Sequence, residues 1–244
     1  MTDLIVITGS SGALGQSIVD AFSSRNNTKL LCIDRAKVHF TNEHQNITEI
    51  EADLSSYDST ADAISQIAFG DFEYCSLLNL AGLIYNEPIV SIREGIFIPH
   101  SEKGWRQTLD SNLDTAFNVS VHFANALMSA RRKGVIVNLS SITADGNPGQ
   151  IAYATAKSAL IGLSNTIGKE LGKFGIRGVS LSLGYIETSS TIQALGEEKI
   201  RIQKRTNPMK RIGDTKEVIN TIDFIISNRF CNATDIKIDG GERI

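Results

Sequence analysis

The pattern with the clearest chemical content is a tyrosine followed four residues later by a lysine, in the run Tyr153-Ala154-Thr155-Ala156-Lys157. The run begins a long segment with helical spacing of apolar residues, and a spacing of four places Tyr153 and Lys157 on one helix face. A nearby ammonium favours the phenolate and so lowers the tyrosine pKa from its usual value of about 10. Such a tyrosine can exchange a proton with a substrate oxygen near neutral pH. The pair therefore predicts acid–base chemistry at an alcohol or carbonyl group.

A glycine-rich turn near the N-terminus has the composition of a phosphate-binding loop. The run Thr8-Gly9-Ser10-Ser11-Gly12-Ala13-Leu14-Gly15 follows a strand-like segment and opens a helical one. Glycines at such a junction let the backbone turn sharply and approach a pyrophosphate, while the helix N-terminus offers N–H donors to the anion. We therefore expect a dinucleotide to contact this turn through Gly9, Ser11, Gly12, Ala13, Leu14 and Gly15.

Asp34 ends the next strand-like segment, close to the distance downstream at which dinucleotide-binding proteins place an acidic residue. A carboxylate there hydrogen-bonds the ribose hydroxyls of the adenosine and repels a 2′-phosphate, which favours NAD. Arg35 follows immediately and could pair with a 2′-phosphate, so NADP stays open as the alternative cofactor.

Strands and helices must alternate along the chain to position these residues. Short apolar runs predict strands at Leu4–Thr8, Lys29–Ile33, Ile47–Ala52, Cys75–Leu80, Gly134–Leu139, Arg177–Leu183 and Asp235–Ile238. Helical spacing predicts helices at Leu14–Phe22, Tyr57–Ala68, Trp105–Arg131, Ala152–Lys173 and Thr215–Ser227. Strands that are apolar throughout indicate a parallel sheet buried on both faces. We predict an α/β fold for residues 1–244: a single-domain, Rossmann-like, doubly wound sheet of about seven parallel strands with helices on both faces.

Two segments do not fit this alternation. Residues 83–104 are irregular but rich in apolar side chains, which is compatible equally with a packed surface excursion and with a role at the substrate entrance. The segment from Ile186 to about Arg211 mixes polar and apolar residues, and we expect it to form a mobile lid over the substrate. Such a mixed composition does not identify the substrate.

Together these motifs resemble the short-chain dehydrogenase/reductase family, of the compact type, over nearly the whole chain. The resemblance implies that Tyr153 and Lys157 act with Ser140, which stands at the family's usual offset before the tyrosine and hydrogen-bonds the substrate oxygen. Ser141 is adjacent and could be mistaken for it, but the spacing favours Ser140. By the same resemblance, Asn112 is the fourth catalytic residue and holds a water that links Lys157 to solvent.

The resemblance also implies further cofactor contacts. Asp53 and Leu54 match the pair that contacts adenine, and the run Asn79-Leu80-Ala81-Gly82 matches the stretch that lines the cofactor, through Asn79, Ala81 and Gly82. The run Leu183 to Thr188 matches the segment that meets the nicotinamide, through Gly184, Ile186 and Thr188, while Tyr153 and Lys157 also face the cofactor. Three residues depart from the family pattern: Ala13 replaces a glycine, Leu80 an asparagine, and Leu183 a proline.

Composition narrows the class of protein. The net charge of −3 lacks the basic excess of a nucleic-acid-binding domain, so we expect no nucleic-acid partner. No apolar run reaches the length of a membrane span, and the N-terminus lacks the pattern of a signal peptide, so we expect a cytoplasmic protein. The cysteines (Cys32, Cys75, Cys231) and histidines (His39, His44, His100, His122) show no ligand spacing, so we expect no metal.

The function predicted first is hydride transfer between NAD(H) and a small secondary alcohol or ketone, with the tyrosine as general acid and base. The alternatives are an NADPH-dependent 3-oxoacyl-(acyl-carrier-protein) reductase, which the 146–150 loop and the stretch 209–213 resemble most, and a sugar or polyol dehydrogenase. A nucleotide-sensing scaffold without turnover is a further alternative, because a fold alone does not determine function. By resemblance, we expect a homotetramer or homodimer joined through the two long helices and the last strand.

Overall fold

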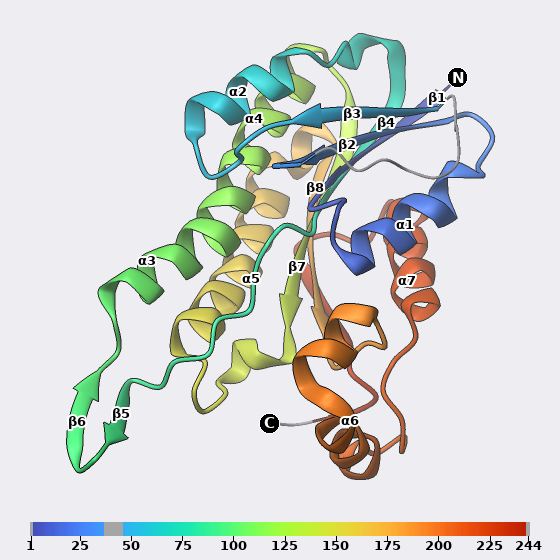
Figure 1. The fold of residues 1–244 in the computed structure, drawn as a ribbon. Coiled ribbons are helices and arrows are strands. Elements are labelled where there is room, and N and C mark those ends of the chain that lie inside the picture. Colours follow the sequence, from blue (N-terminus) through green and yellow to red (C-terminus); the bar gives the residue numbers. More distant parts are fainter. Residues whose placement is uncertain (1, 37–45, 243–244) are drawn as a thin grey trace.

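The computed structural model describes residues 2–36 and 46–242 (Figure 1). Its centre is a sheet of seven parallel strands in the order β3-β2-β1-β4-β7-β8-β9. The strands are β1 (Thr2–Thr8), β2 (Thr28–Asp34), β3 (Ile47–Glu51), β4 (Phe72–Asn79), β7 (Lys133–Ser141), β8 (Ile176–Leu183) and β9 (Thr234–Ile238). The predicted α/β class and parallel sheet are confirmed, with strand ends shifted by up to three residues.

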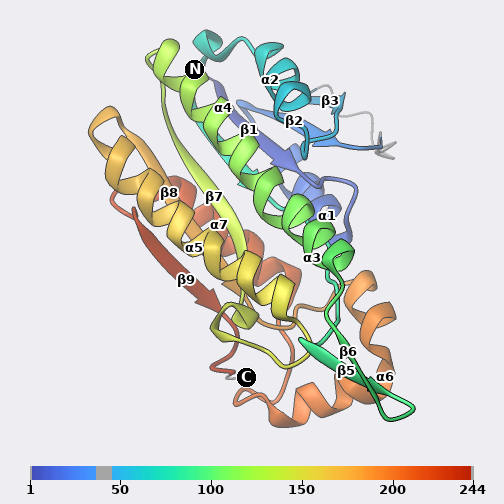
Figure 2. The ribbon, with the colours of Figure 1, turned by 90° about the vertical axis from the view of Figure 1, so that its left-hand side faces the viewer.

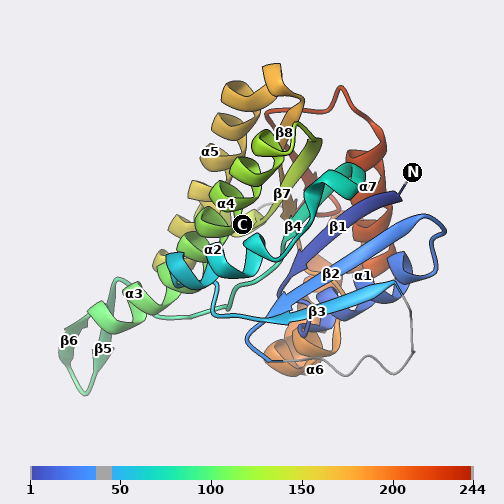
Figure 3. The ribbon, with the colours of Figure 1, turned by 90° about the horizontal axis from the view of Figure 1, so that it is seen from above.

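Helices cover both faces of this sheet, as Figures 2 and 3 show. One face carries α1 (Ala13–Ser23) and α7 (Thr215–Ser227), and the other carries α2 (Tyr57–Ser65), α4 (Thr115–Ser129) and α5 (Ile151–Leu171). The core has two layers because successive strand residues point to opposite faces. In β1, Ile5 and Ile7 pack with α1 and α7, whereas Leu4 and Val6 pack with α2 and α4.

The order of the strands creates a crevice where the binding residues meet. The chain winds outward from β1 to β2 and β3, and then returns to place β4 on the other side of β1. The connections after β1 and β4 therefore leave the carboxyl edge in opposite directions, which opens a crevice typical of ligand sites in such sheets. Thr8 and Asn79 end these two strands and are paired in register.

Two regions differ from the predicted pattern. Residues 83–104 are not wholly irregular, because they contain the antiparallel hairpin of β5 (Val90–Arg93) and β6 (Ile96–Pro99), which extends away from the sheet (Figure 1). The predicted helix 105–131 is α3 (Glu102–Leu109), a π-helical turn (Asp110–Asp114) and then α4. The predicted lid contains α6 (Ser189–Thr206), in which Gly196 has non-helical angles and divides the helix into two parts.

Candidate functional site

The turn between β1 and α1 is shaped by its glycines. Gly9 has φ +68°, and a Cβ there would lie 2.7 Å from the Cα of Ala81. A Cβ on Gly15 would lie 2.4 Å from the Gly9 carbonyl oxygen, and the Gly12 N–H donates to that oxygen at 3.2 Å. Gly12 occupies the position before α1 and forms no side-chain hydrogen bond there, so no capping side chain satisfies the first N–H groups of the helix, which begins at Ala13.

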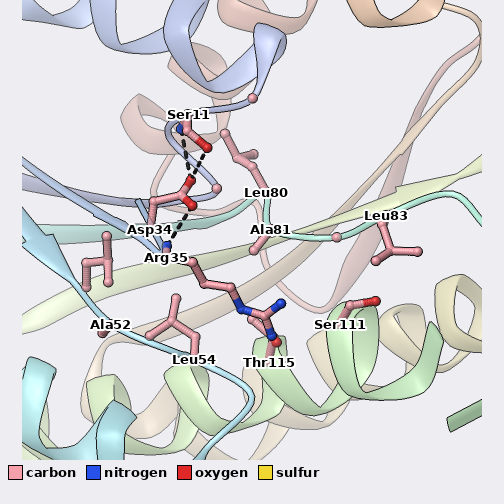
Figure 4. Close-up of a pocket in the computed structure, with 14 residues that line it drawn as sticks. Ser11, Asp34, Arg35, Ala52, Leu54, Leu80, Ala81, Leu83, Ser111 and Thr115 are labelled. Carbon is pink, nitrogen blue, oxygen red and sulfur yellow. Dashed lines mark hydrogen bonds between the residues drawn. The ribbon is translucent and has the colours of Figure 1, made fainter. Parts of the chain in front are cut away.

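A cavity of about 230 Å³ opens beside this turn, at the crevice between β1 and β4 (Figure 4). The Thr8 hydroxyl accepts hydrogen bonds from the N–H groups of Leu80 (3.2 Å) and Ala81 (3.4 Å), which holds the two strand ends together. An uncapped helix end in a glycine cradle fits a pyrophosphate group. The cavity is lined by Gly9, Ser11, Gly12, Ile33, Asp34, Arg35, Ala52, Leu54, Leu80, Ala81, Gly82, Leu83, Ser111 and Thr115.

Asp34 and Arg35 lie on the cavity wall with different hydrogen-bond partners. The Asp34 carboxylate accepts from the backbone N–H of Ser11 (2.9 Å) and from its hydroxyl (2.7 Å), which Figure 4 shows at one end of the cavity. The Arg35 guanidinium donates twice to Asp53, at 2.9 and 3.1 Å, and to Ser55 at 3.2 Å. Hydrogen bonds from Ser55, together with Arg35, lower the pKa of Asp53. Arg35 is thus held by a carboxylate, while Asp34 has no cationic side chain bonded to it among the described residues.

Tyr153 and Lys157 lie on one face of α5, as their spacing predicted. The Lys157 Nζ lies 5.4 Å from the centre of the Tyr153 ring and donates to the Leu139 carbonyl at 2.9 Å. Burial lowers the pKa of Lys157 to about 8, and burial raises the pKa of Tyr153 to about 12. We expected the ammonium to lower the tyrosine pKa, but burial of the phenol has the larger effect and raises it. The phenol stays protonated at neutral pH and is suited to donate a proton.

Ser141, and not the predicted Ser140, is the serine beside the tyrosine. A side-chain hydrogen bond from Ser141 to Tyr153 partly offsets the rise in the tyrosine pKa. The Ser140 hydroxyl is buried and donates to the Lys157 carbonyl at 2.8 Å. The physical reason is strand alternation: β7 continues to Ser141, and successive side chains of a strand point to opposite faces. Ser140 therefore anchors α5, and Ser141 faces the phenol.

The π-helical turn presents Asn112 to the same cluster. Its amide nitrogen donates to the carbonyls of Leu83 (2.9 Å) and Thr108 (3.0 Å), but its buried Oδ1 accepts no hydrogen bond from the described residues. A Cβ on Gly82 would lie 2.4 Å from this Oδ1 and 3.6 Å from the Lys157 Nζ. An unpartnered buried acceptor beside the lysine fits a bound water, because buried polar groups normally have a partner.

Asn79 lies away from the cavity, contrary to its predicted contact with the cofactor. Its amide nitrogen donates to Asn138 (2.8 Å), to Ser120 (3.1 Å) and to the Ala116 carbonyl (3.4 Å). These partners are on β7 and α4, so the side chain ties strands to a helix inside the fold. Leu54, Ala81 and Gly82 do line the cavity, whereas Asp53 reaches it only through its pair with Arg35.

The segment after β8 brings the remaining predicted residues to the carboxyl edge of the sheet. The Gly184 N–H donates to the Ile238 carbonyl at 2.9 Å, and a Cβ on Gly184 would lie 2.9 Å from the Asp239 Cα. Ile186 is buried and pairs with Gly213 in a short parallel bridge. The Glu187 N–H donates to the Gly213 carbonyl, and the Gly213 N–H donates to the Tyr185 carbonyl. Thr188 caps α6 by accepting from the Thr191 N–H at 3.1 Å, a role that its sequence position did not predict.

Other features bear on the chemistry of the site. Within residues 2–36 and 46–242, no group of three or more His, Cys, Asp or Glu side chains could hold a metal; His39 and His44 lie outside these residues. The three cysteines are unpaired, and burial raises the pKa of both Cys32 and Cys75 to about 12. No helix in the described part of the chain is long and apolar enough to cross a membrane. Ser111 and Thr115 line the cavity although neither was predicted to do so.

Comparison with known proteins gives a consistent result. A family model described as short chain dehydrogenase matches residues 3–199. The 3-oxoacyl-(acyl-carrier-protein) reductase of Staphylococcus epidermidis is 29% identical over 197 residues, which cover 79% of this chain and 76% of the relative. Human (3R)-3-hydroxyacyl-CoA dehydrogenase is 28% identical over 256 residues, which cover 98% and 94%.

Solved structures share the fold. A 4-hydroxyisoleucine dehydrogenase complexed with NADH superposes with a TM-score of 0.86 at 23% identity, covering 98% of both chains. ElxO with NADP bound has a TM-score of 0.86 at 22% identity, covering 99% of this chain and 98% of the other. At this level of identity the likeness extends to the fold.

Proposed function

The chain belongs to the short chain dehydrogenase family, and we propose that it transfers a hydride between NAD(H) and a secondary alcohol or ketone, with Tyr153 as general acid and base. As a member of this family it is an NAD(P)-dependent oxidoreductase that acts on hydroxyl or keto groups. The observation that supports the proposal most is the cluster of Tyr153, Ser141 and Lys157. It lies next to the cavity beside the glycine-rich turn, because a Cβ on Gly82, which lines that cavity, would be 3.6 Å from the Lys157 Nζ.

Each residue of the cluster has a distinct role in the proposed reaction. The nicotinamide, when bound, supplies or accepts the hydride. The substrate oxygen accepts hydrogen bonds from the hydroxyls of Ser141 and Tyr153. The Ser141 oxygen already accepts from the Thr143 N–H at 3.2 Å, which leaves its proton directed to another acceptor. In reduction, Tyr153 donates its proton to the oxygen as the carbon gains the hydride; in oxidation it takes the proton back.

Lys157 and Asn112 act around this proton transfer. The Lys157 ammonium stabilises negative charge on Tyr153 as the phenol loses its proton. The Asn112 Oδ1 holds a water from which the proton can be replaced. Gly82 leaves the space that this arrangement needs, since a Cβ there would displace the amide oxygen.

The cofactor cleft favours NAD over NADP. The Asp34 carboxylate faces the position of the adenosine ribose and would repel a 2′-phosphate. The cation that could offset this repulsion, Arg35, is already bonded twice to Asp53. Ser11, Gly12 and the N-terminus of α1 would hold the pyrophosphate.

The direct test of this function measures catalytic turnover and NADH binding on the same protein. NADH oxidation is followed against a panel of ketones, oxo acids and sugars, and NADH affinity is measured in parallel. We expect turnover of at least one carbonyl compound. Tight NADH binding with no turnover across the panel, in either direction, would favour a nucleotide-sensing protein.

A second candidate is reduction of 3-oxoacyl thioesters. It is favoured by the relatives that carry this name, and by the loop Gly146-Asn147-Pro148-Gly149-Gln150 before α5. The two candidates differ in cofactor and substrate. Preference for NADPH, with 3-oxoacyl thioesters reduced far faster than simple ketones, would select the second.

We also propose that copies of the chain associate through α4 and α5 to form a dimer or tetramer. The exposed side chains along α5 are small and uncharged over three turns, and Phe117 and Met128 of α4 are exposed apolar side chains. A helix face of this kind suits close packing on a second copy. Light scattering after size exclusion tests it: Phe117→Glu should yield monomers.

A further inference from the structure

We propose that the hollow between α6 and the loop before α5 binds an anionic group of the substrate, a carboxylate or a phosphate, through Lys199. This inference rests on the proposed function, because it concerns the substrate of the same site. It identifies a residue that determines specificity and stands outside the proton-transfer cluster.

Two parts of the wall of this hollow lie close along the chain to residues of the proposed site. It has a volume of about 350 Å³, and its wall includes the loop 147–150, which leads into α5 two residues before Tyr153. Another part of its wall is Tyr185, which directly precedes Ile186 in the segment predicted to meet the nicotinamide. The hollow is lined by Asn86, Asn147, Pro148, Gly149, Gln150, Tyr185, Leu195, Lys199, Ile202 and Gln203.

Lys199 supplies the charge of this hollow. It is the one basic side chain of the lining, which includes no carboxylate, and no carboxylate of the described residues lies within ion-pair distance of its Nζ. The neighbouring Lys204 differs, since it pairs with Glu187 at 3.4 Å. Lys199, Ile202 and Gln203 are three and four residues apart in the second part of α6, and this spacing places them on one face. Glu197 and Glu198 of the same helix do not line the hollow.

Most of the other side chains that line the hollow are amides and aliphatic groups, which would surround the anion. A chain of amides crosses one wall, because Asn147 donates to Gln150 at 2.8 Å and Gln150 donates to Asn86 at 2.7 Å. Opposite it, Leu195 and Ile202 are apolar. A group with a negative end and a short aliphatic spacer matches this lining, because the cation and amides meet the charge while the aliphatic side chains meet the spacer.

Three probes test the inference by calorimetry on the enzyme with NADH: 4-oxopentanoate, its neutral methyl ester, and 4′-phosphopantetheine. We expect wild type to bind at least one anionic probe roughly tenfold more tightly than the ester. Lys199→Ala should remove that preference and Lys199→Arg should keep most of it. Lys204→Ala is the matched control and should leave the preference unchanged.

The probe that loses affinity in Lys199→Ala identifies which anionic group of the substrate the hollow binds. Loss of affinity for 4-oxopentanoate indicates a substrate carboxylate, and loss for 4′-phosphopantetheine indicates the phosphate of a thioester carrier; either supports the proposal. Equal affinity of wild type for all three probes, or an undiminished preference in Lys199→Ala, would overturn it. These experiments measure binding constants, whereas the proposed function is tested by turnover. Failure of this inference can therefore be distinguished from failure of the proposed function.

Discussion

At the scale of single residues, burial governs the protonation of Tyr153 and Lys157, the two ionisable side chains of the proposed reaction. Tyr153 keeps its proton because its pKa rises to about 12, and Lys157 holds its charge only up to a pKa of about 8. Desolvation disfavours the charged form of each group, which moves the two pKa values in opposite directions. A protonated phenol beside a lysine with a pKa of about 8 suits the proposed reduction, in which the phenol donates its proton.

This arrangement predicts the pH dependence of reduction. Tyr153 stays protonated across the accessible range, whereas Lys157 loses its positive charge as the pH rises through about 8. We expect kcat/KM for ketone reduction, which reports groups of the free enzyme, to be level between pH 6 and 7 and to fall above about 8. A profile that stays level to pH 10 would contradict this role of Lys157.

The two adjacent serines provide a matched pair of variants. Ser141→Ala removes a hydrogen-bond donor to the substrate oxygen and should lower kcat roughly 10²–10³-fold with the fold intact. Ser140→Ala removes a buried hydrogen bond to α5, so it should cost about 1 kcal/mol of stability and leave kcat within a few-fold. Steady-state kinetics and thermal unfolding of both variants decide the assignment. A larger loss of kcat in Ser140→Ala than in Ser141→Ala would restore the original prediction.

The sequence indicated a serine near the tyrosine, but the structure places Ser141, and not Ser140, beside Tyr153. Spacing along the chain counts residues, whereas the side that a strand residue faces depends on where the strand ends, and β7 ends two residues later than its apolar run. The pair Tyr153 and Lys157 was predictable because a helix converts a spacing of four into proximity. Asn79 was assigned to the cofactor through family resemblance, and its hydrogen bonds to β7 and α4 could not be read from the sequence.

At the scale of elements, the π-helical turn between α3 and α4 positions the side chain of Asn112, for which we propose a role in proton transfer. Such turns widen a helix locally and are frequent at functional sites. Here the turn directs Asn112 toward Gly82 and Lys157. Periodicity predicted one uninterrupted helix, because a single π turn barely changes the apolar spacing. The kink at Gly196 in α6 and the β5–β6 hairpin were likewise not predicted, since their exposed residues follow no buried pattern.

Gly82→Ala tests how the turn and the strand end fit together. The new Cβ would meet the Asn112 Oδ1 at 2.4 Å, so the amide must move away from the position in which we propose that it holds a water. We expect kcat to fall at least tenfold, within the range attributed to acid–base groups. Gly70→Ala is the control, because a Cβ there has no neighbour within 4 Å, and it should leave kcat unchanged. Equal kcat in both variants would show that the Asn112 position does not matter.

At the scale of the whole molecule, the doubly wound sheet converts distant sequence motifs into one crevice. Apolar runs along the chain were sufficient to predict its parallel strands, because strands buried on both faces read as nearly continuous apolar runs. The strand order then brings the ends of β1 and β4 together, with Gly9 against Ala81. The identity of the substrate was not predictable, because the segment 186–211 and the irregular segment 83–104 mix polar and apolar residues in a way that points to no one substrate.

Cofactor preference should appear as a difference in global stability. A ligand that binds only the folded state at 100 times its Kd stabilises by about 2.7 kcal/mol, which raises the Tm of a chain of this size by about 5–10 °C. We expect this shift with NADH and a much smaller one with NADPH at equal concentration. Asp34→Ser should narrow the difference because it removes the charge that repels the 2′-phosphate. A larger shift with NADPH for wild type would contradict the preference for NAD.

The central claim, that Tyr153 exchanges the proton that accompanies hydride transfer, is tested most directly by Tyr153→Phe, assayed for turnover and NADH affinity in the same preparation. Phenylalanine keeps the ring beside Lys157 and removes only the hydroxyl. We expect kcat to be lowered roughly 10²–10⁴-fold with NADH affinity unchanged. Turnover near that of wild type, with NADH still bound, would contradict it.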